Sequence, residues 1–204
     1  MTVTKIESVT KTRYRIYIDG QFAFVLYKGE LSRYHIAENK EITEEIYETI
    51  RKEVILKRVK LKAMHLLNDM DRTESQLRTK LKTGGYTEDM VDAALSYVKS
   101  YGYVNDEAYA RRFIESRKDR KSRTEIYGAL CQKGISKELI ECAMEEYYGS
   151  GDAREAIEKI LVKKKYDPAT ATNAEKQRIL GYLTRKGFRY DDIRQVIQVS
   201  EWNA

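Results

Sequence analysis

One pattern of residues occurs three times along the chain, and it limits the folds that the chain can adopt. Each copy has an apolar residue, a leucine four positions later, a glycine, an aromatic or aliphatic residue, and then a second apolar stripe. The copies are QLRTKLKTGGYTEDMVDAAL, EIYGALCQKGISKELIECAM and RILGYLTRKGFRYDDIRQVI, and their leucines are Leu81, Leu130 and Leu183. These leucines are 49 and 53 residues apart. Such periods are typical of stacked helical units that bury their apolar faces against each other.

The glycine in each copy predicts how a helix ends. We expect Gly85, Gly134 and Gly187 at the left-handed position after the last helical turn, where the lack of a Cβ is favourable. The apolar residue after the glycine can then fold back on the helix. Acidic residues follow and open the next helix, where their charge opposes the positive helix end. Each unit is therefore predicted to hold a helix, a glycine turn and a second helix.

A third helix is expected before each of these pairs. The first is the end of ITEEIYETIRKEVILKRVKLKAMHLLNDM, a segment without proline or glycine that predicts one long helix or two nearly collinear helices. Its apolar stripe has steps of three and four residues and consists of Ile46, Ile50, Val54, Ile55, Val59, Ala63, Leu66 and Leu67. The other two are NDEAYARRFIESRK and DAREAIEKILVKKK.

The N-terminal residues follow a different pattern. RYRIYIDGQFAFVLY places β-branched and aromatic residues on both sides of Asp19-Gly20, and Asp-Gly favours the type I′ turn of a β-hairpin. The preceding VTKIESV predicts a third strand. A single sheet of three strands is not expected to be stable by itself, so we expect it to pack on the first helices.

Together these patterns predict a mainly α protein with an N-terminal β-hairpin or three-stranded sheet, followed by three tandem three-helix repeats in an elongated curved array. The expected segments are 1–29 for the β segment, 30–103 for the first repeat with its lead-in helices, 104–149 for the second repeat and 150–204 for the third. Charged residues make up 34% of the chain, against roughly 25% in an average domain. That excess fits a body with a large exposed surface.

The composition argues against several classes of protein. Cys131 and Cys142 lie in separate helical segments without a CxxC or Cys/His cluster, so reduced cysteines in the core are expected. His35 and His65 lack the spacing of metal ligands, and we expect neither a metal nor another cofactor. There is no apolar run of about 18 residues and no signal-like start. A cytoplasmic protein without membrane contact is therefore expected.

The stretch YVNDEAYARRF places two acids before two arginines. Asn105 is a good N-cap residue, and Asp106 and Glu107 fall in the first turn of the predicted helix. A catalytic carboxylate pair would need a histidine or a metal as partner, and the sequence offers neither nearby. We therefore expect these acids to be structural and the protein not to be an enzyme.

Basic residues are clustered, although 38 lysines and arginines face 32 acids in total. Six basic residues and one acid lie between Arg51 and Lys62, and seven basic residues and two acids lie between Arg111 and Arg123. Such clusters indicate a polyanionic partner, and the alternative interpretation is a solvated helix face. The candidate nucleic-acid or filament contacts are Lys57, Arg58, Lys60, Arg112, Arg117, Lys118, Arg120, Lys121, Arg123, Arg185 and Lys186.

YGYVNDEAYARRFIESR, followed by the LCQKGI turn, resembles the signature region of the RecX family, the small regulators of the RecA recombinase. The RYRIYIDGQFAF hairpin is similar to the version of that family that carries an extra β segment. The resemblance covers nearly the whole chain and is most specific between Tyr101 and Ile135. The chain departs from the family pattern at KSRTEI, where the family often has a glycine.

The resemblance implies a non-enzymatic inhibitor that lies along the groove of a RecA filament on DNA. It would depress the ATPase, strand-exchange and coprotease activities of RecA, and so act in recombination, DNA repair and the SOS response. The implied partners are the RecA filament and single- and double-stranded DNA. A monomer is the expected state.

Two other functions stay open at this point. Helix pairs joined by a glycine turn also describe a helix-turn-helix protein that binds nucleic acid directly. Against it, the second helices EDMVDAALSYV and KELIECAMEEYY are acidic or neutral and would not attract phosphates. The other alternative is a helical scaffold that binds only protein. Many of the sixteen tyrosines fall at core positions, but Tyr101 and Tyr103 could stack on bases.

Overall fold

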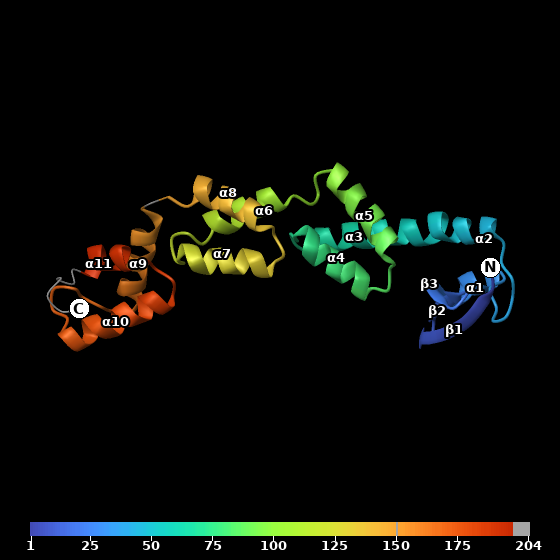
Figure 1. Cartoon of the computed structure of the whole chain (residues 1–204), viewed down its shortest axis with the longest axis horizontal. Coiled ribbons are helices and arrows are strands. Elements are labelled where there is room, and N and C mark those ends of the chain that lie inside the picture. Colours follow the sequence, from blue (N-terminus) through green and yellow to red (C-terminus); the bar gives the residue numbers. More distant parts are fainter. Residues whose placement is uncertain (150, 198–204) are drawn as a thin grey trace. The chain divides into compact units, whose positions relative to one another are not determined.

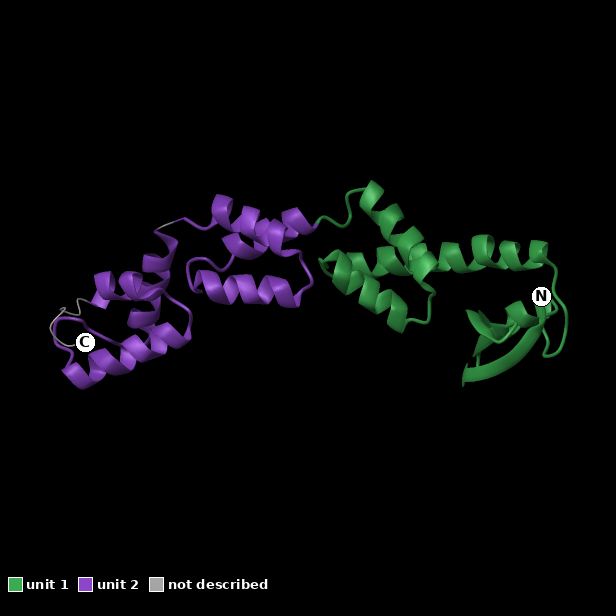
Figure 2. Ribbon diagram, viewed as in Figure 1, with its two compact units in different colours: residues 1–105 green, residues 106–204 purple. Residues whose placement is uncertain are grey.

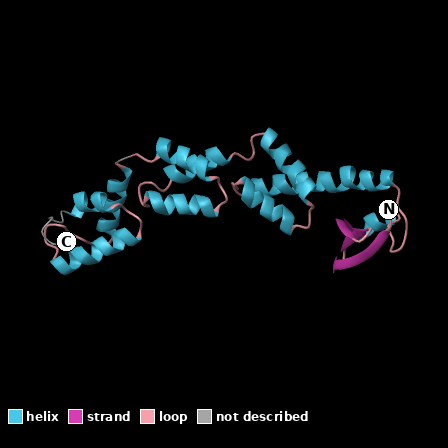
Figure 3. Ribbon diagram, in the orientation of Figure 1, coloured by secondary structure: helices cyan, strands magenta, loops and turns pink. Residues whose placement is uncertain are grey.

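The protein consists of a small sheet and a succession of helices, as the computed structural model shows (Figure 1), and its structure is described for residues 1–149 and 151–197. Packing divides it into unit 1, Met1–Asn105, and unit 2, Asp106–Ala204 (Figure 2). All strands of the described chain lie in unit 1 (Figure 3). Among the described residues, no helix has both the length and the apolar character that a membrane crossing requires.

The sheet opens unit 1 and is antiparallel, with the strand order β1-β2-β3. Its strands are β1 Val3–Thr10, β2 Arg13–Ile18 and β3 Gln21–Tyr27. Asp19 and Gly20 have φ angles of 48° and 82°, which are the positive values that a type I′ turn needs. Both the hairpin and the third strand predicted from the sequence are confirmed.

A long helical segment follows the short helix α1, Lys28–Arg33. It runs without a break through α2, Glu44–Thr49, the π-helical segment η1, Ile50–Leu56, and α3, Lys57–Asp69. Ile50 and Ile55 are both buried, five residues apart, because a π turn holds more residues than an α turn. The long helix is confirmed, and all eight residues of the predicted apolar stripe belong to the core of unit 1 or pack against it. The π-helical segment was not predicted.

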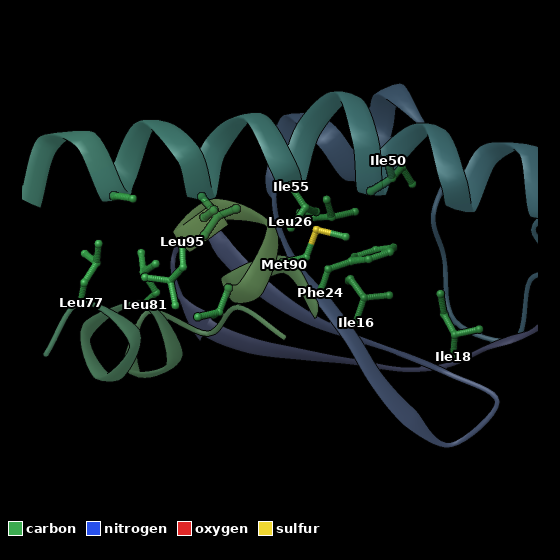
Figure 4. Packing of buried hydrophobic residues seen from close by; sticks show 14 of the residues in the cluster. Ile16, Ile18, Phe24, Leu26, Ile50, Ile55, Leu77, Leu81, Met90 and Leu95 are labelled. Carbon is green, nitrogen blue, oxygen red and sulfur yellow. The ribbon is translucent and has the colours of Figure 1, made fainter. Parts of the chain in front are cut away.

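The sheet packs on this long helix. Figure 4 shows Ile16, Phe24 and Leu26 of the sheet beneath Ile50 and Ile55. All five side chains are buried in one hydrophobic core of unit 1. The expectation that the three-stranded sheet packs on the first helices is therefore confirmed.

The other helices form the rest of three groups of three. In unit 1 they are α4 Glu74–Thr83 and α5 Glu88–Ser100. In unit 2 they are α6 Asp106–Glu115, α7 Arg123–Gln132, α8 Lys137–Tyr147, α9 Asp152–Lys163, α10 Asn173–Arg185 and α11 Tyr190–Ile197. The groups α6–α8 and α9–α11 share one hydrophobic core. The mainly α class with tandem three-helix repeats is confirmed, and the exact segment boundaries stay a prediction.

The three glycine turns have the predicted conformation. Gly85, Gly134 and Gly187 have φ angles of 86°, 78° and 81°. In the second repeat, the N–H of Ile135 donates to the carbonyl oxygen of Leu130 at 3.4 Å, so the chain folds back over the helix end. The left-handed helix ends that define the repeat are therefore confirmed.

A further feature of the repeat lies at the start of the first helix of each pair. The hydroxyls of Thr73, Ser122 and Thr172 accept the backbone N–H three residues later, at 3.2, 3.1 and 3.3 Å. The corresponding sequences TESQ, SRTE and TNAE all match the capping-box pattern. This signal marks where each of these helices begins.

Two local predictions have different outcomes. Helix α6 begins at Asp106 and buries Ala110 and Ile114 completely, so the predicted helix start is confirmed. Both cysteines are free thiols, but Cys131 is only half-buried and Cys142 is exposed. The expectation of core cysteines is therefore wrong for Cys142, because its position on α8 faces away from the core that Ala143 and Met144 enter.

Candidate functional site

A basic cavity of about 490 Å³ lies in unit 2, between the connection from α6 to α7 on one side and α9 and α10 on the other. Six of its nine lining residues are basic and one is acidic. The lining residues are Arg120, Lys121, Glu125, Lys159, Ile160, Lys163, Lys164, Tyr182 and Lys186.

Two neighbouring cavities share residues with this one and extend it. The first shares Arg120 and Lys121 and adds Arg117. The second shares Lys163, Lys164 and Tyr182, and adds three basic residues, Lys165, Arg178 and Arg185, and two acids, Asp167 and Glu175. Because their linings overlap, we treat the three cavities as one depression, called the basic groove from here on.

Helical spacing explains why the basic side chains of α9 face the groove. Lys159 and Lys163 are four residues apart, so they lie on one face of the helix. Ala156 and Ile157 are fully buried on the other face, within the core of unit 2. The core therefore fixes the rotation of α9 and with it the direction of the lysines.

The two walls of the groove are held together by polar contacts between the second and third repeats. The buried hydroxyl of Ser122 donates to the carbonyl oxygen of Lys186 at 2.5 Å, and that of Thr124 donates to the carbonyl oxygen of Gly187 at 3.1 Å. The ammonium of Lys186 pairs with Glu125 at 3.1 Å. The start of α7 is thus fixed to the glycine turn after α10, a contact called the repeat joint from here on.

Some cations of the groove have acidic partners. The Lys159 ammonium lies 2.9 Å from the Asp119 carboxylate and, through a hydrogen bond to it, lowers the pKa of Asp119. Hydrogen bonds to Glu155 and then to Asp119 raise the pKa of Lys159, and a hydrogen bond to Glu125 raises the pKa of Lys186. These lysines are therefore held in the charged form.

Other cations of the groove are open to a ligand. Lys121 and Lys163 make no ion pair within residues 1–149 and 151–197. The Lys164 ammonium lies 4.0 Å from the centroid of the Tyr182 ring, a contact that leaves its hydrogen-bond donors available. The groove can therefore bind a polyanion through these three lysines without first breaking an ion pair.

Five of the predicted contact residues line the groove: Arg117, Arg120, Lys121, Arg185 and Lys186. The guanidinium of Arg117 stacks 3.8 Å from the centroid of the Phe113 ring. That of Arg120 donates to the carbonyl oxygen of Ser116 at 2.8 Å. These contacts orient both guanidinium groups at the mouth of the groove.

Three other predicted residues of unit 2 do not line the groove. Lys118 pairs with Asp152 at 3.4 Å. Arg123 lines a separate cavity together with Arg189 and Asp192. Arg112 lies near the end of α6 and lines none of these three groove cavities.

The predicted residues of unit 1 have internal contacts. Lys57 pairs with Glu53, and the Lys60 ammonium lies 4.6 Å from the centroid of the Tyr97 ring. The Arg58 guanidinium is half-buried, donates to the carbonyl oxygen of Val25 at 3.0 Å and pairs with Glu30. Arg58 thus ties α3 to the sheet and to α1, so its role within unit 1 is structural.

The lysines of the third repeat were not among the contacts predicted from the sequence. Lys159, Lys163, Lys164 and Lys165 belong to the segment EKILVKKK, whose run of three lysines was a visible signal. The sequence pattern predicts that run only as part of a helix of the repeat. No group of three or more potential metal ligands occurs in the described part of the chain.

Models of one protein family match three parts of the chain. The first three-helix domain of RecX matches residues 60–97, the second matches residues 105–144 and the third matches residues 152–197. The matched segments include the whole of α6, α7, α9 and α10 and hence both walls of the basic groove.

Individual proteins are similar over nearly the whole length. The chain is 35% identical to "Regulatory protein RecX" of Caldanaerobacter subterraneus subsp. tengcongensis over 202 residues, which cover 98% of this chain and 100% of that protein. It is 27% identical to the protein of the same name from Clostridium beijerinckii, with 97% and 94% covered.

Two solved structures have a similar fold. One is a crystal structure of regulatory protein RecX, with a TM-score of 0.61 and 24% identity over 97% of this chain and 98% of that one. The other is the crystal structure of RecX from Lactobacillus salivarius, with a TM-score of 0.57 and 23% identity over 71% of this chain and 95% of that one. At these identities the likeness supports the fold alone.

Proposed function

We propose, because the chain belongs to the RecX family of regulatory proteins, that it binds the RecA filament on DNA and inhibits RecA. Inhibition would extend to the ATPase, strand-exchange and coprotease activities of RecA. The protein would then act in recombination, DNA repair and the SOS response, in the cytoplasm and as a monomer.

The observation that carries this proposal is the basic groove. A filament of RecA on DNA is a repeating polyanionic surface, and phosphate contacts with lysine and arginine supply affinity that falls as salt rises. Lys121, Lys163 and Lys164 face such a ligand without acidic partners. Lys159 and Lys186 line the same groove, and their own ion pairs orient them and keep them charged.

The proposed action is binding and not catalysis. The carboxylate of Glu125 and that of Asp119, beside the groove, are engaged by Lys186 and Lys159. Asp167 and Glu175, which also line the groove, accept hydrogen bonds from the hydroxyls of Thr170 and Thr172. A general acid or base needs a pKa near the working pH, whereas the pKa of Asp119 is lowered further from that range by its hydrogen bond with Lys159. Occupation of the filament surface is a sufficient mechanism of inhibition.

The experiment compares a groove variant with a matched control. Lys121, Lys163 and Lys164 are replaced by glutamate in the groove variant, and the exposed residues Lys11, Lys40 and Lys137 are replaced by glutamate in the control. Both variants change the formal charge by the same amount. The measured quantity is the rate of ATP hydrolysis by RecA on single-stranded DNA at low and at moderate salt.

We expect the parent and the control to lower the rate of ATP hydrolysis equally, and the groove variant to lower it much less. Higher salt should weaken inhibition by the parent, because the phosphate contacts are screened. A parent chain without effect on RecA would refute the proposed function. A groove variant that inhibits as well as the parent would show that another surface binds the filament.

The second candidate function is direct binding of nucleic acid without RecA. The basic groove favours it, since lysines that bind filament phosphates would bind free DNA as well. The helix-turn-helix mode is less well supported, because α5 and α8 carry acidic residues in their first turns. Salt-dependent binding of duplex DNA without RecA, lost in the groove variant, would favour this candidate over a scaffold that binds only protein.

A further inference from the structure

Three tyrosines form a row of contacting rings at the end of α5. The ring centroids of Tyr97 and Tyr101 are 5.0 Å apart, and those of Tyr101 and Tyr103 are 5.7 Å apart with nearly parallel planes at 13°. Tyr101 and Tyr103 are 60% and 54% exposed, among the most exposed large hydrophobic residues of the described chain. These three residues are called the tyrosine ladder from here on.

The way in which α5 ends explains why the outer two rings lie side by side. Gly102 has a φ of 71°, its N–H donates to the carbonyl oxygen of Lys99 at 2.9 Å, and the N–H of Tyr103 donates to that of Val98 at 3.0 Å. This pair of bonds defines a Schellman turn, which folds the chain back over the last helical turn. The residues on either side of Gly102 are thereby brought together.

Tyr97 packs partly against the core of unit 1, but the two outer rings of the tyrosine ladder, those of Tyr101 and Tyr103, are not needed to fill that core. Val104, the residue after the ladder, is 5% exposed and belongs to the hydrophobic core of unit 1. Val98, one turn earlier, is fully buried. Because these valines anchor the helix end on both sides, two large aromatic rings remain on the surface without a packing role.

The charges around the tyrosine ladder favour an anionic partner. The Lys60 ammonium lies 4.6 Å from the centroid of the Tyr97 ring. The sequence has no acid between Glu53 and Asp69, the part of the long helix that contains Lys60, and none between Asp92 and Asp106, the part that contains the ladder. An acid from another helix, Glu74, is paired with Lys99 at 2.7 Å.

We infer that the tyrosine ladder stacks on unpaired bases of single-stranded nucleic acid. Sites for single strands combine flat, exposed rings with nearby cations, because every nucleotide has a base that can stack on a ring and a phosphate that a cation can neutralise. Paired bases are already stacked within the duplex and cannot use the ladder. This goes beyond the proposed function, in which the basic groove binds phosphates and does not distinguish single strands from duplexes.

The test uses the full chain and two fluorescently labelled strands of equal length, one of thymidines and one of abasic residues. Both strands carry the same phosphates, but only the first can stack. The variants are Tyr101→Ala and Tyr103→Ala, alone and together. The controls are the phenylalanine variants at both positions, which keep the rings, and Tyr190→Ala, which removes an exposed tyrosine elsewhere.

We expect each alanine substitution to weaken binding of the thymidine strand about five-fold or more, as the loss of one base–aromatic stack does. Binding of the abasic strand should stay as in the parent. The phenylalanine variants and Tyr190→Ala should bind both strands normally. Far-UV circular dichroism of every variant should match that of the parent, because the rings are exposed.

Several results would overturn the inference. They are a parent chain that does not bind the thymidine strand, alanine variants that bind it as the parent does, and equal losses on both strands. Alanine variants that bind both strands normally but no longer inhibit RecA would assign the rings to a protein contact instead. A failure of the proposed function looks different, because RecA inhibition would then be absent while the two strands are still distinguished.

Discussion

Gly187→Ala tests the repeat joint, which holds the walls of the basic groove together. Gly187 has a φ of 81°, and its carbonyl oxygen accepts the hydroxyl of Thr124 at 3.1 Å. A Cβ at this position would lie 2.7 Å from the Cβ of Thr124 and 3.1 Å from the hydroxyl oxygen of Ser122. Alanine therefore adds both backbone strain and a steric overlap.

The two effects can be estimated separately. The left-handed conformation costs an L-residue about 1–2 kcal/mol relative to glycine. Overpacking of a closed contact costs about 1–3 kcal/mol. The free energy of unfolding should therefore fall by about 2–5 kcal/mol. Because the overlap can be relieved only by parting the repeats, inhibition of RecA should weaken as well.

Gly20→Ala is the matched control for the strain. Gly20 has nearly the same φ, 82°, but a Cβ there would meet nothing within 4 Å. Its substitution should cost only the strain of about 1–2 kcal/mol. Urea denaturation, followed by circular dichroism, measures both losses. In a Thr124→Gly background the contact with the Thr124 side chain disappears and only the contact with the hydroxyl oxygen of Ser122 remains, so Gly187→Ala should there cost less than in the parent background.

Equal losses for Gly187→Ala and Gly20→Ala would show that the contact between the repeats contributes nothing to stability. The same conclusion would follow if Thr124→Gly did not reduce the cost of Gly187→Ala.

Three further substitutions test local features. Asp106→Ala removes an acid from the first turn of α6 and should lower the free energy of unfolding by about 1 kcal/mol in urea denaturation. Any loss of RecA inhibition should follow the loss of stability, and a fully stable variant without RecA inhibition would show that Asp106 is not merely structural. Arg58→Ala should lower the free energy of unfolding by about 2 kcal/mol in thermal or urea unfolding, because Glu30 and the carbonyl oxygen of Val25 lose a half-buried cation. An unchanged free energy of unfolding would show that Arg58 is not needed for the fold and is available for binding a partner. Burial raises the pKa of Tyr148 to about 12 in the folded chain, above the value of about 10 in the unfolded chain. The contribution of Tyr148 to stability is therefore fully present below about pH 10, and it is lost as the pH rises towards the pKa of the folded chain. The free energy of unfolding of Tyr148→Phe should therefore fall less steeply than that of the parent at alkaline pH, and identical slopes would contradict the assignment.

Local patterns predicted most of the fold, because each depends on neighbours in sequence. Asp19-Gly20 specifies a hairpin turn by its own backbone preferences, and Gly134 ends α7 for the same kind of reason. The π-helical turn between Ile50 and Ile55 was not predictable in this way. The elements that pack on this turn, β3 and α5, are far from it in the sequence.

The candidate site was predictable only in part. The charge cluster around Arg120 and Lys121 is visible in the sequence, and it does line the groove. The opposite wall comes from Lys159 and Lys163, some forty residues further on, and only the packing of the third repeat against the second brings them near. Charge counting also could not show that Arg58 is engaged by Glu30, since that pair joins residues 28 positions apart.

We propose that the basic groove holds the filament by binding phosphates or acidic side chains. The test of this proposal is the dissociation constant of the chain for a RecA filament assembled on DNA with a non-hydrolysable ATP analogue, measured over a series of salt concentrations. The parent is compared with the variant in which Lys121, Lys163 and Lys164 are replaced by glutamate. We predict weaker binding of the variant at low salt, and convergence with the parent at high salt. The slope of log affinity against log salt should be less steep by about one for each phosphate that the variant no longer neutralises. A variant with the affinity and the salt slope of the parent would contradict the claim.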